Sequence, residues 1–479
     1  MFKFFLLNIG IINAKESDLA ILKVIYNIKQ MHIVEQDPYL EPYANVVQGR
    51  QSRWSARLEE INKQFDSLLN YASWHKDLGF HIERGHLVYR DWIPQVKQVF
   101  LVGEFNSWKE DLHPMIRGNS DLWSIKIPLK SFPQQSPHLQ KIKLRMQIEN
   151  GNFIDRIPAM MNHCYQDPIS MEFCGLLWFP EKKYVWKSKW PTPPKPLLIY
   201  EAHVGMAQEK DGVGTYQEFR DSILPRIAEG NYSAIQLMGI QEHPYYGSFG
   251  YQVSSYFAPS SRFGTPDDLK SLIDRAHALG LSVILDLVHS HSVKNTLDGL
   301  SEYNGTEYQY FHEGPRGYHT LWDSRLFNYG KHEVQRFLLS NILYWLDEFH
   351  FDGFRFDGIT SMLYLHHGHY KQFNHYDMYF NNEVDEEAIC YLQLANEVIH
   401  QYNKNAISIA EDISGMPGLC RPISEGGIGF DFRMHMGVAD YWIKILKECK
   451  DENWPLDSIY HELTNGRRDE KNQQTKSKD

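Results

Sequence analysis

The sequence predicts an α/β protein whose main part is a parallel (β/α)8 barrel, preceded by a β-sandwich and an N-terminal helical segment. Its 479 residues suffice for a barrel of about 250 residues and for additional modules. In the second half, short continuous apolar runs alternate with longer helical stretches, which is typical of a buried parallel sheet. Polar residues gather where these runs end, as they do in barrel enzymes.

The composition is that of an ordinary globular protein. Hydrophobic residues make up 42% and charged residues 23%, which excludes a disordered or fibrous chain. The formal net charge of −11 argues against a nucleic-acid partner. Aromatic residues reach 14%, which indicates a large aromatic core or, alternatively, a surface that stacks on flat ligands such as sugars. No apolar stretch reaches the roughly 18 residues of a membrane helix, so no membrane partner is expected.

The cysteines indicate a reducing compartment. The five of them lie far apart and form no Cys-x-x-Cys pair, which is typical of free thiols. A short apolar run near the start, residues 4–12, lacks a convincing small-x-small cleavage site and does not predict a signal peptide. We therefore expect a cytoplasmic protein.

The first two modules follow from periodicity. Residues 1–80 are predicted to form an N-terminal helical segment, because Leu58, Ile61 and Leu68 recur at helical spacing. Residues 81–190 contain short alternating runs (HLVYRDW, VKQVFLVGEF, LWSIKI) punctuated by Gly, Pro and Asn, which predicts a β-sandwich. The proline-rich stretch at 190–196 marks the boundary, since prolines stiffen a linker.

The barrel is predicted over residues 197–471. Its first five strands are expected in LLIYEAHVG, SAIQLMGI, LSVILDLVH, FDGFRFDG and AISIAED, with a sixth near Gly429 to Phe432. A doubly wound sheet would place its ligand groups similarly, but no Gly-rich phosphate loop follows the first run. Residues 472–479 are polar and lack an apolar period, so they are predicted to form a disordered tail.

Acidic residues at two strand ends are candidates for catalysis. Arg355 and Asp357 stand two apart, so on a strand both side chains face the same way. A neighbouring guanidinium lowers the pKa of a carboxyl and keeps it ionised, as a covalent glycosidase nucleophile requires, although a structural ion pair fits equally well. Glu411 ends the fifth run, where a poorly solvated acid suits a general acid. Taken alone, it fits a carboxylate that caps the next turn better.

Histidines and aromatic residues complete the pattern. In DLVHSH, an extended segment would place His289 and His291 on one face and Asp286 on the other. These residues lack the further ligands expected of a catalytic zinc, so no metal is predicted. The HHGH stretch at 366–369 is expected to be a solvated loop. In SFGYQ, an aromatic ring beside Gly250 would lie flat on a sugar or belong to the core. Together these groups indicate glycoside chemistry.

DLVHSH, GFRFDG and SIAED, in this order, resemble the first three signature regions of the α-amylase superfamily. Longer stretches, among them GSFGYQVSSYFAPSSRFGTPDDL and YFHEGPRGYHTLWDSRLFNYG, resemble the eukaryotic-type 1,4-α-glucan (glycogen or starch) branching enzymes from about Asp37 to Arg468. The resemblance implies that the β-sandwich is a carbohydrate-binding module. It also implies that α-1,4 bonds of glycogen, amylose or amylopectin are cut and the segment passed to a 6-hydroxyl, without a cofactor.

The resemblance further implies roles for individual residues. Asp357 would be the nucleophile and Glu411 the acid/base. Arg355 would orient Asp357. The subsite for the cleaved sugar would be lined by Tyr251, Asp286 and His291. Trp322 and other loop aromatics would guide the glucan chain.

One departure bears on activity. The resemblance implies a fourth region, a His-Asp pair that supplies a third catalytic carboxylate soon after LTNGRR, whereas this sequence reads LTNGRRDEKNQQTKSKD. Two barrel strands are missing as well. We therefore expect a C-terminally truncated barrel and a chain without full activity. The alternatives are a non-catalytic glycan-binding fragment and an α-glucan hydrolase of the same superfamily.

Overall fold

A computed structural model describes residues 32–193 and 196–464 of the chain. The predicted disordered tail at 472–479 and residues 1–31 of the predicted helical segment lie outside this range. Within it, no helix combines the length and the apolar character needed to cross a membrane.

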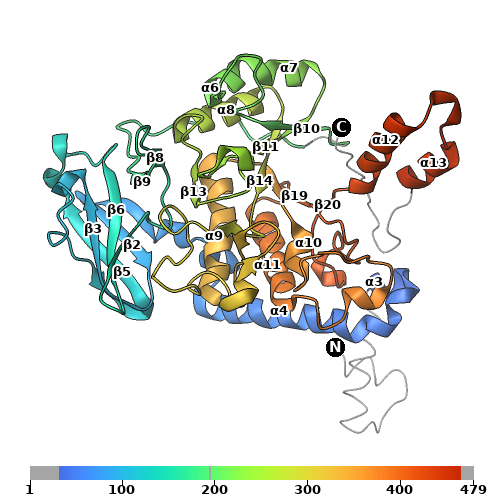
Figure 1. Ribbon diagram of the computed structural model, residues 1–479, viewed down its shortest axis with the longest axis horizontal. Coiled ribbons are helices and arrows are strands. Elements are labelled where there is room, and N and C mark those ends of the chain that lie inside the picture. Colours follow the sequence, from blue (N-terminus) through green and yellow to red (C-terminus); the bar gives the residue numbers. More distant parts are fainter. Residues whose placement is uncertain (1–31, 194–195, 465–479) are drawn as a thin grey trace, which may run out of the picture.

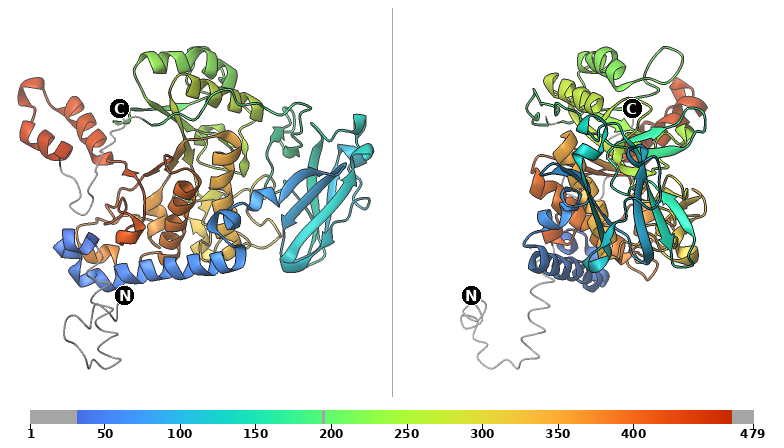
Figure 2. Two further views of the ribbon diagram at one scale, coloured as in Figure 1. Left: turned by 180° about the vertical axis from the view of Figure 1, so that it is seen from behind. Right: turned by 90° about the vertical axis from the view of Figure 1, so that its left-hand side faces the viewer.

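A long helix supports the rest of the molecule. Helix α4 (Ala44–Phe65) runs beneath the central helices, as both side-on views show (Figures 1 and 2). It ends at Asp66, whose φ of 64° breaks the helix, and Ser67 then caps α5 (Leu68–Ala72) by accepting from the Asn70 N–H. The predicted apolar stripe packs inward, since Ile61 and Leu68 are buried.

Two antiparallel sheets form the β-sandwich, on one side of the molecule (Figure 1). One sheet has the order β1-β2-β5-β4, and the other has the order β3-β6-β9-β8 with β7 paired to β6. The predicted runs at 86–92 and 122–127 lie in β2 and β5. The strands are β1 (Gly79–Glu83), β2 (His86–Trp92), β3 (Val96–Gly103), β4 (Ile116–Arg117), β5 (Leu122–Pro128), β6 (Lys141–Ile148), β7 (Phe153–Arg156), β8 (Cys164–Gln166) and β9 (Phe173–Leu176).

A buried hydrogen-bond network joins the sandwich to the rest of the chain. Asp91 on β2 accepts hydrogen bonds from the Tyr89 hydroxyl at 2.5 Å and the Tyr303 hydroxyl at 2.8 Å. Tyr303 belongs to the central domain and accepts in turn from the Ala159 N–H at 2.9 Å. Burial raises the pKa of Asp91 to about 6, against the lowering effect of these hydrogen bonds.

The central domain contains a six-stranded parallel sheet whose strand order equals the chain order. Its strands are β10 (Ile199–His203), β11 (Ala234–Met238), β14 (Ser282–Leu287), β18 (Gly353–Phe356), β19 (Ile407–Ala410) and β20 (Phe432–Arg433). The order is that of the first six strands of a (β/α)8 barrel, and the last strand lies where the sixth was predicted. No further strand of the described residues joins β20 to β10, so these residues do not close an eight-stranded barrel.

Helices cover the sheet because the chain must cross over between parallel strands. The covering helices are α6 (Tyr216–Glu218), α7 (Leu224–Glu229), α8 (Pro266–Ala278), α9 (His332–Phe349), α10 (Ile359–Leu363) and α11 (Glu386–Tyr402). Helices α12 (Met436–Glu448) and α13 (Leu456–Thr464) follow β20 and form a hairpin at the side (Figure 1). Short strands in the loops are β12 (Gln241–Glu242), β13 (Ser255–Pro259), β15 (Ser292–Val293), β16 (Tyr318–His319) and β17 (Ser324–Arg325).

Candidate active site

The Arg355 side chain contacts three carboxylates at the carboxyl ends of β14, β18 and β19. The Arg355 Nη1 atom donates to Asp286 Oδ1 at 2.5 Å and to Asp357 Oδ1 at 2.8 Å, and Nη2 lies 2.6 Å from Glu411 Oε2. Parallel neighbouring strands bring these residues together, since Asp286 pairs with Arg355 in the ladder. The Arg355 and Asp286 side chains are only 2% and 1% exposed, whereas those of Asp357 and Glu411 are 12% and 21% exposed.

The two more exposed carboxylates face a cavity of about 420 Å³. Tyr251, His291 and Trp322 line it too, so most of the residues predicted for the site meet there. Asp286 and Arg355 lie behind this lining. The Tyr251 hydroxyl donates to Asp286 Oδ2 at 3.0 Å, which ties the cavity wall to the carboxylate cluster.

The electrostatics of Asp357 differ from the sequence expectation. Arg355 lowers the pKa of Asp357 as predicted, but burial has the larger effect, and Glu411 and Asp286 add like-charge repulsion. Together they raise the pKa of Asp357 to about 8, so the prediction of a permanently ionised carboxylate is wrong for this cavity. The main reason is burial of the Asp357 carboxyl, and the two other carboxyl groups that share Arg355 add to it.

Two uses were predicted for an acid at the end of this strand, a general acid and a cap of the next turn. In the structure Glu411 and Asp412 take one position each. Asp412 is buried and caps the turn after β19, accepting from the backbone N–H groups of Ser414, Gly415 and Met416. Glu411 instead lines the cavity, where its Oε2 accepts from the Gly358 N–H at 3.0 Å. The interpretation as a turn cap thus applies to Asp412, whereas the Glu411 side chain faces the cavity.

The histidines of DLVHSH do not share one face, because the extended segment on which that placement depended ends before it reaches them. Strand β14 ends at Leu287, so the chain turns before it reaches them. His289 is buried, with ring nitrogens 2.7 Å from the Tyr391 hydroxyl and 3.0 Å from Asn341 Oδ1, whereas His291 lines the cavity. The described residues hold no group of three or more His, Cys, Asp or Glu side chains that could bind a metal ion.

The predicted solvated loop at 366–369 is partly buried instead. The His366 ring stacks on Tyr364 at 5.2 Å, and His367 lines the cavity. The His367 and His369 rings both approach His319, at 5.1 and 4.8 Å. The loop packs because α10, which precedes it, is wholly buried and carries it toward the site.

Several cavity residues were not found by sequence reasoning. Thr360, Ser361 and His367 line the wall, and His319 stacks on Trp322 with ring centroids 3.9 Å apart. Thr360 and Ser361 lie on the short helix α10 and His367 lies in the loop after it, and neither segment is long enough to show an apolar period. One signal was available in the sequence, the final glycine of GFRFDG. In the structure this residue, Gly358, has a φ of 61°, and a Cβ there would lie 3.0 Å from the Trp322 ring.

Comparisons with known proteins agree with this fold and site. Residues 77–161 match the family model of Carbohydrate-binding module 48 (Isoamylase N-terminal domain), and residues 221–314 match that of Alpha amylase, catalytic domain. The chain resembles the solved structure of a putative alpha amylase from Salmonella typhimurium, with a TM-score of 0.58 and 19% identity over 81% of this chain and 58% of that chain. The fold and the carboxylate cluster define a member of the α-amylase superfamily.

Similar curated proteins narrow this class. The chain is 49% identical over 441 residues to the 1,4-alpha-glucan-branching enzyme of Dictyostelium discoideum, covering 92% of this chain and 65% of that one. It is 48% identical over 443 residues to the 1,4-alpha-glucan-branching enzyme 2-2, chloroplastic/amyloplastic of Arabidopsis thaliana, covering 92% and 55%. The chain is a homologue of proteins named 1,4-alpha-glucan-branching enzyme, and it spans about 65% of the length of the Dictyostelium relative.

Proposed function

We propose that the chain acts on α-1,4-glucan as a branching transferase, cutting an α-1,4 bond and passing the segment to a 6-hydroxyl to form an α-1,6 branch. The observation that carries the proposal is the cluster in which Arg355 contacts Asp286, Asp357 and Glu411 while the last two line one cavity. A pair of carboxyl groups facing one cavity is the arrangement that glycoside chemistry requires.

In the first step, Glu411 protonates the glycosidic oxygen and Asp357 attacks the anomeric carbon. The α-1,4 bond breaks, and a covalent glucosyl ester forms on Asp357. Arg355 orients the Asp357 carboxylate through its 2.8 Å hydrogen bond. Tyr251 and His291, which line the cavity, hold the sugar that carries the cleaved bond, and Asp286 holds the Tyr251 hydroxyl from behind the lining.

In the second step, Glu411 removes the proton from a glucan 6-hydroxyl, and that oxygen displaces Asp357 from the anomeric carbon. Both displacements invert this carbon, so the configuration is retained. Trp322 and its loop neighbours would hold the acceptor chain, because a 38% exposed indole at the cavity mouth offers a flat surface to a sugar ring.

The charge of the cluster suits this sequence of steps. Burial, with repulsion from Glu411 and Asp286, raises the pKa of Asp357 to about 8, so the cluster carries a proton near neutral pH. The first step needs that proton on Glu411, because only an ionised Asp357 can attack. A substrate oxygen that accepts from Glu411 would favour this arrangement of the proton.

The same proposal covers the organisation and location of the chain. The proposed domains are an N-terminal helical segment at 1–80, of which residues 32–80 are described, a carbohydrate-binding module at 81–190 that binds glucan, and a catalytic part at 197–471, whose described residues carry six barrel strands. The five free cysteines support a cytoplasmic location, since three of them are buried and none forms a disulfide.

A second candidate function is glucan binding without transfer. Residues 412–479 contain no His-Asp pair, so the third catalytic carboxylate that the family resemblance implies is not among these 479 residues. Retention on amylose without turnover would support this candidate. A hydrolase of the same superfamily would instead release new reducing ends.

Proton NMR of amylose incubated with the 479-residue chain tests the proposal. A new α-1,6 anomeric signal without a matching rise in reducing ends is the expected result for branching. The Asp357→Asn variant is the matched control, because it keeps the side-chain shape but cannot form the ester. If a folded sample gives no α-1,6 signal, the transfer proposal is wrong for this chain; if reducing ends rise instead, it is a hydrolase.

A further inference from the structure

Trp322 stands in the loop of a β-hairpin beside the reaction cavity. The hairpin strands β16 and β17 pair His319 with Ser324, and residues 320–323 form the loop between them. Strand β17 also pairs with β15, which begins directly after His291. The base of the hairpin is therefore joined to the cavity wall, whereas the Trp322 side chain lies in the loop and is partly exposed.

Two hydrogen bonds hold the Trp322 backbone in this loop. Its N–H donates to the Nδ1 atom of His319 at 3.1 Å, and its carbonyl oxygen accepts from the side-chain amide of Gln252 at 3.0 Å. Gln252 belongs to a different loop and also lines the cavity. The backbone at Trp322 is thus tied to two side chains, one at the base of its own hairpin and one in the cavity wall.

The same histidine also contacts the indole ring. The His319 and Trp322 rings are stacked, with centroids 3.9 Å apart and planes 13° from parallel. His291 meets the indole at 4.9 Å with its ring tilted by 48°. The Gly358 backbone approaches the indole as well, since a Cβ at this position would lie 3.0 Å from the Cη2 atom. His319 thus covers one face of the indole, and the exposed remainder of the ring is available to a ligand.

His319 is itself held in place by burial. Its side chain is fully buried, and the rings of His367 and His369 approach it at 5.1 and 4.8 Å. Burial is the main cause that lowers the pKa of His319 to about 3, and the neighbouring histidines add to it. A neutral imidazole has one nitrogen that can accept the Trp322 N–H, whereas both nitrogens of a protonated ring are donors. The surroundings of His319 therefore favour the form that the hydrogen bond requires.

We propose that His319 is a positioning residue that fixes the orientation of the Trp322 indole before a ligand binds. It acts both as the ring on which the indole is stacked and as the acceptor for the Trp322 N–H. That the ligand is a glucan chain rests on the proposed function. An aromatic surface that is already oriented loses less conformational entropy on binding than one that must first be ordered. Because His319 is buried, it raises glucan affinity without touching the sugar.

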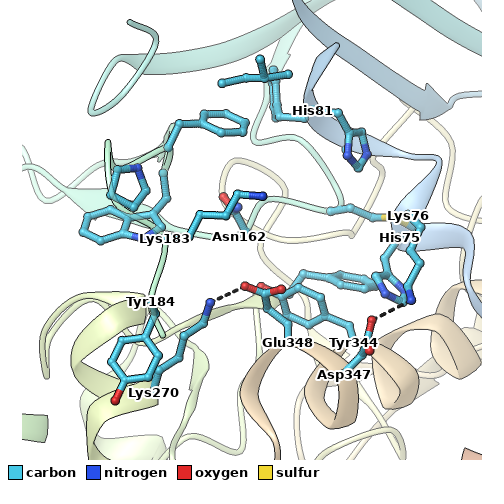
Figure 3. A pocket seen from close by; sticks show the side chains of 18 of the residues that line it. His75, Lys76, His81, Asn162, Lys183, Tyr184, Lys270, Tyr344, Asp347 and Glu348 are labelled. Atoms are coloured by element: carbon cyan, nitrogen blue, oxygen red, sulfur yellow. Dashed lines mark hydrogen bonds and ion pairs between the residues drawn. The ribbon is translucent and has the colours of Figure 1, made fainter. Parts of the chain in front are cut away.

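Another histidine provides a matched control. A second cavity, of about 650 Å³, lies between the β-sandwich and the central domain and shares no lining residue with the reaction cavity. His75 lines it, and Figure 3 shows this residue beside Tyr344 and the Lys76–Asp347 ion pair. The His75 ring packs edge-on against Tyr344 at 5.7 Å, and burial lowers its pKa to about 3, as it does for His319. Replacing His75 thus removes a comparable imidazole outside the reaction cavity.

Fluorine NMR of the 479-residue chain labelled with fluorotryptophan tests this inference without any ligand. The Trp322→Phe variant assigns the Trp322 resonance by its absence. We expect the same single resonance in the wild type and in His75→Ala, because the indole keeps its support in both. In His319→Ala, loss of the stacked ring and of the acceptor should shift this resonance and broaden or split it. An unchanged resonance in His319→Ala would overturn the proposal.

A double-mutant cycle, read by calorimetric titration with maltoheptaose, tests what this positioning does for binding. Trp322→Ala should weaken binding at least about fivefold and His319→Ala about two- to fivefold, whereas His75→Ala should leave the affinity unchanged. The double variant His319→Ala/Trp322→Ala should bind no more weakly than Trp322→Ala alone, because His319 acts through the indole. Losses that add in the double variant would overturn the proposal, since His319 would then act independently of Trp322.

The His319→Phe variant covers the case in which His319→Ala does not fold. It keeps a ring stacked on the indole but removes the acceptor, so a Trp322 resonance and an affinity between those of wild type and His319→Ala are expected. Equal weakening by His319→Ala and His75→Ala would overturn the positioning role. If the wild type binds no maltoheptaose, the proposed function is wrong, and a changed Trp322 resonance in the His319 variants would still support the positioning of the indole.

Discussion

The Arg355 guanidinium lies 2.8 Å from Asp357 Oδ1, behind a cavity that Asp357 and Glu411 both line. This arginine is almost fully buried and is the shared partner of three carboxyl groups. Arg355 therefore positions the carboxylates of the proposed site and also stabilises the fold. A buried carboxylate without a partner lowers the free energy of unfolding.

Replacing Arg355 by Ala should therefore destabilise the protein strongly. We expect the free energy of unfolding at pH 8 to fall by about 3–5 kcal/mol, since Asp286 and its two neighbours lose the guanidinium that contacts all three. Urea denaturation followed by circular dichroism measures it. The control is Arg53→Ala, which removes a half-exposed partner of Glu386 and should cost no more than about 1 kcal/mol. Equal losses in both variants would mean that the cluster is solvated.

The pH dependence of stability should report on Asp357. Its folded-state pKa of about 8 lies above the unfolded value of about 3.9, so the native state binds the extra proton. The stability that this proton contributes is complete below pH 4 and is lost as the pH rises toward 8. Between about pH 7 and 8, where Asp91 is almost fully ionised, wild-type stability should fall, and Asp357→Asn should flatten the curve. An unchanged slope in the variant would assign the proton to another group.

Trp322 should contribute to glucan affinity and little to stability. Its side chain is exposed at the cavity mouth and rests on His319, so its removal leaves no cavity in the core. Stacking of a sugar on an indole is worth about 1 kcal/mol or more, and Trp322→Ala should weaken maltoheptaose binding at least about fivefold. Leu321→Ala changes a more exposed neighbour that does not line the cavity and should leave affinity unchanged. A similar loss in both variants would point to a shift of the whole loop.

Gly358 should tolerate no side chain, because it stands at a crowded left-handed position. An alanine there would adopt a φ of 61° at a cost of about 1 kcal/mol and would place its Cβ 3.0 Å from both Ser290 Oγ and the Trp322 ring. We expect Gly358→Ala to lower both stability and maltoheptaose affinity. Gly85→Ala is the control, because it carries a similar strain at φ 77° with nothing within 4 Å of its Cβ. Unchanged affinity in Gly358→Ala would show that Trp322 can move aside.

Periodicity predicted the strands and helices because burial repeats along them. The five apolar runs from LLIYEAHVG to AISIAED all became neighbouring strands, and their ends brought Asp286, Asp357 and Glu411 together. Properties that depend on neighbours distant in sequence could not be predicted in this way. The pKa of Asp357 depends on how many carboxyl groups share Arg355, and the places of His289 and His367 depend on where β14 ends and how the later loop packs.

Asp91 should couple the sandwich to the central domain. Its buried carboxyl accepts from Tyr89, Tyr303 and the Trp92 N–H, so Asp91→Ala leaves three buried donors without their acceptor. We expect a loss of about 2–5 kcal/mol in the free energy of unfolding, measured by urea denaturation, because each such donor costs about 1–3 kcal/mol. Asp121→Ala, which removes a more exposed partner of Arg117 at the edge of the same sheet, should cost under about 1 kcal/mol.

The pH profile of the Asp91→Ala variant adds a second readout. Burial raises the pKa of Asp91 to about 6, so in the wild type the folded state binds this proton more tightly than the unfolded state does. The stability that the bound proton contributes is complete below about pH 4 and is lost as the pH rises through 6. The variant should lack this part of the decline, so the difference in stability from wild type should be larger at pH 4.5 than at pH 7. A difference that does not change with pH would mean that Asp91 is already ionised at pH 4.5, and that the two tyrosine hydroxyls stabilise the charge more than burial opposes it.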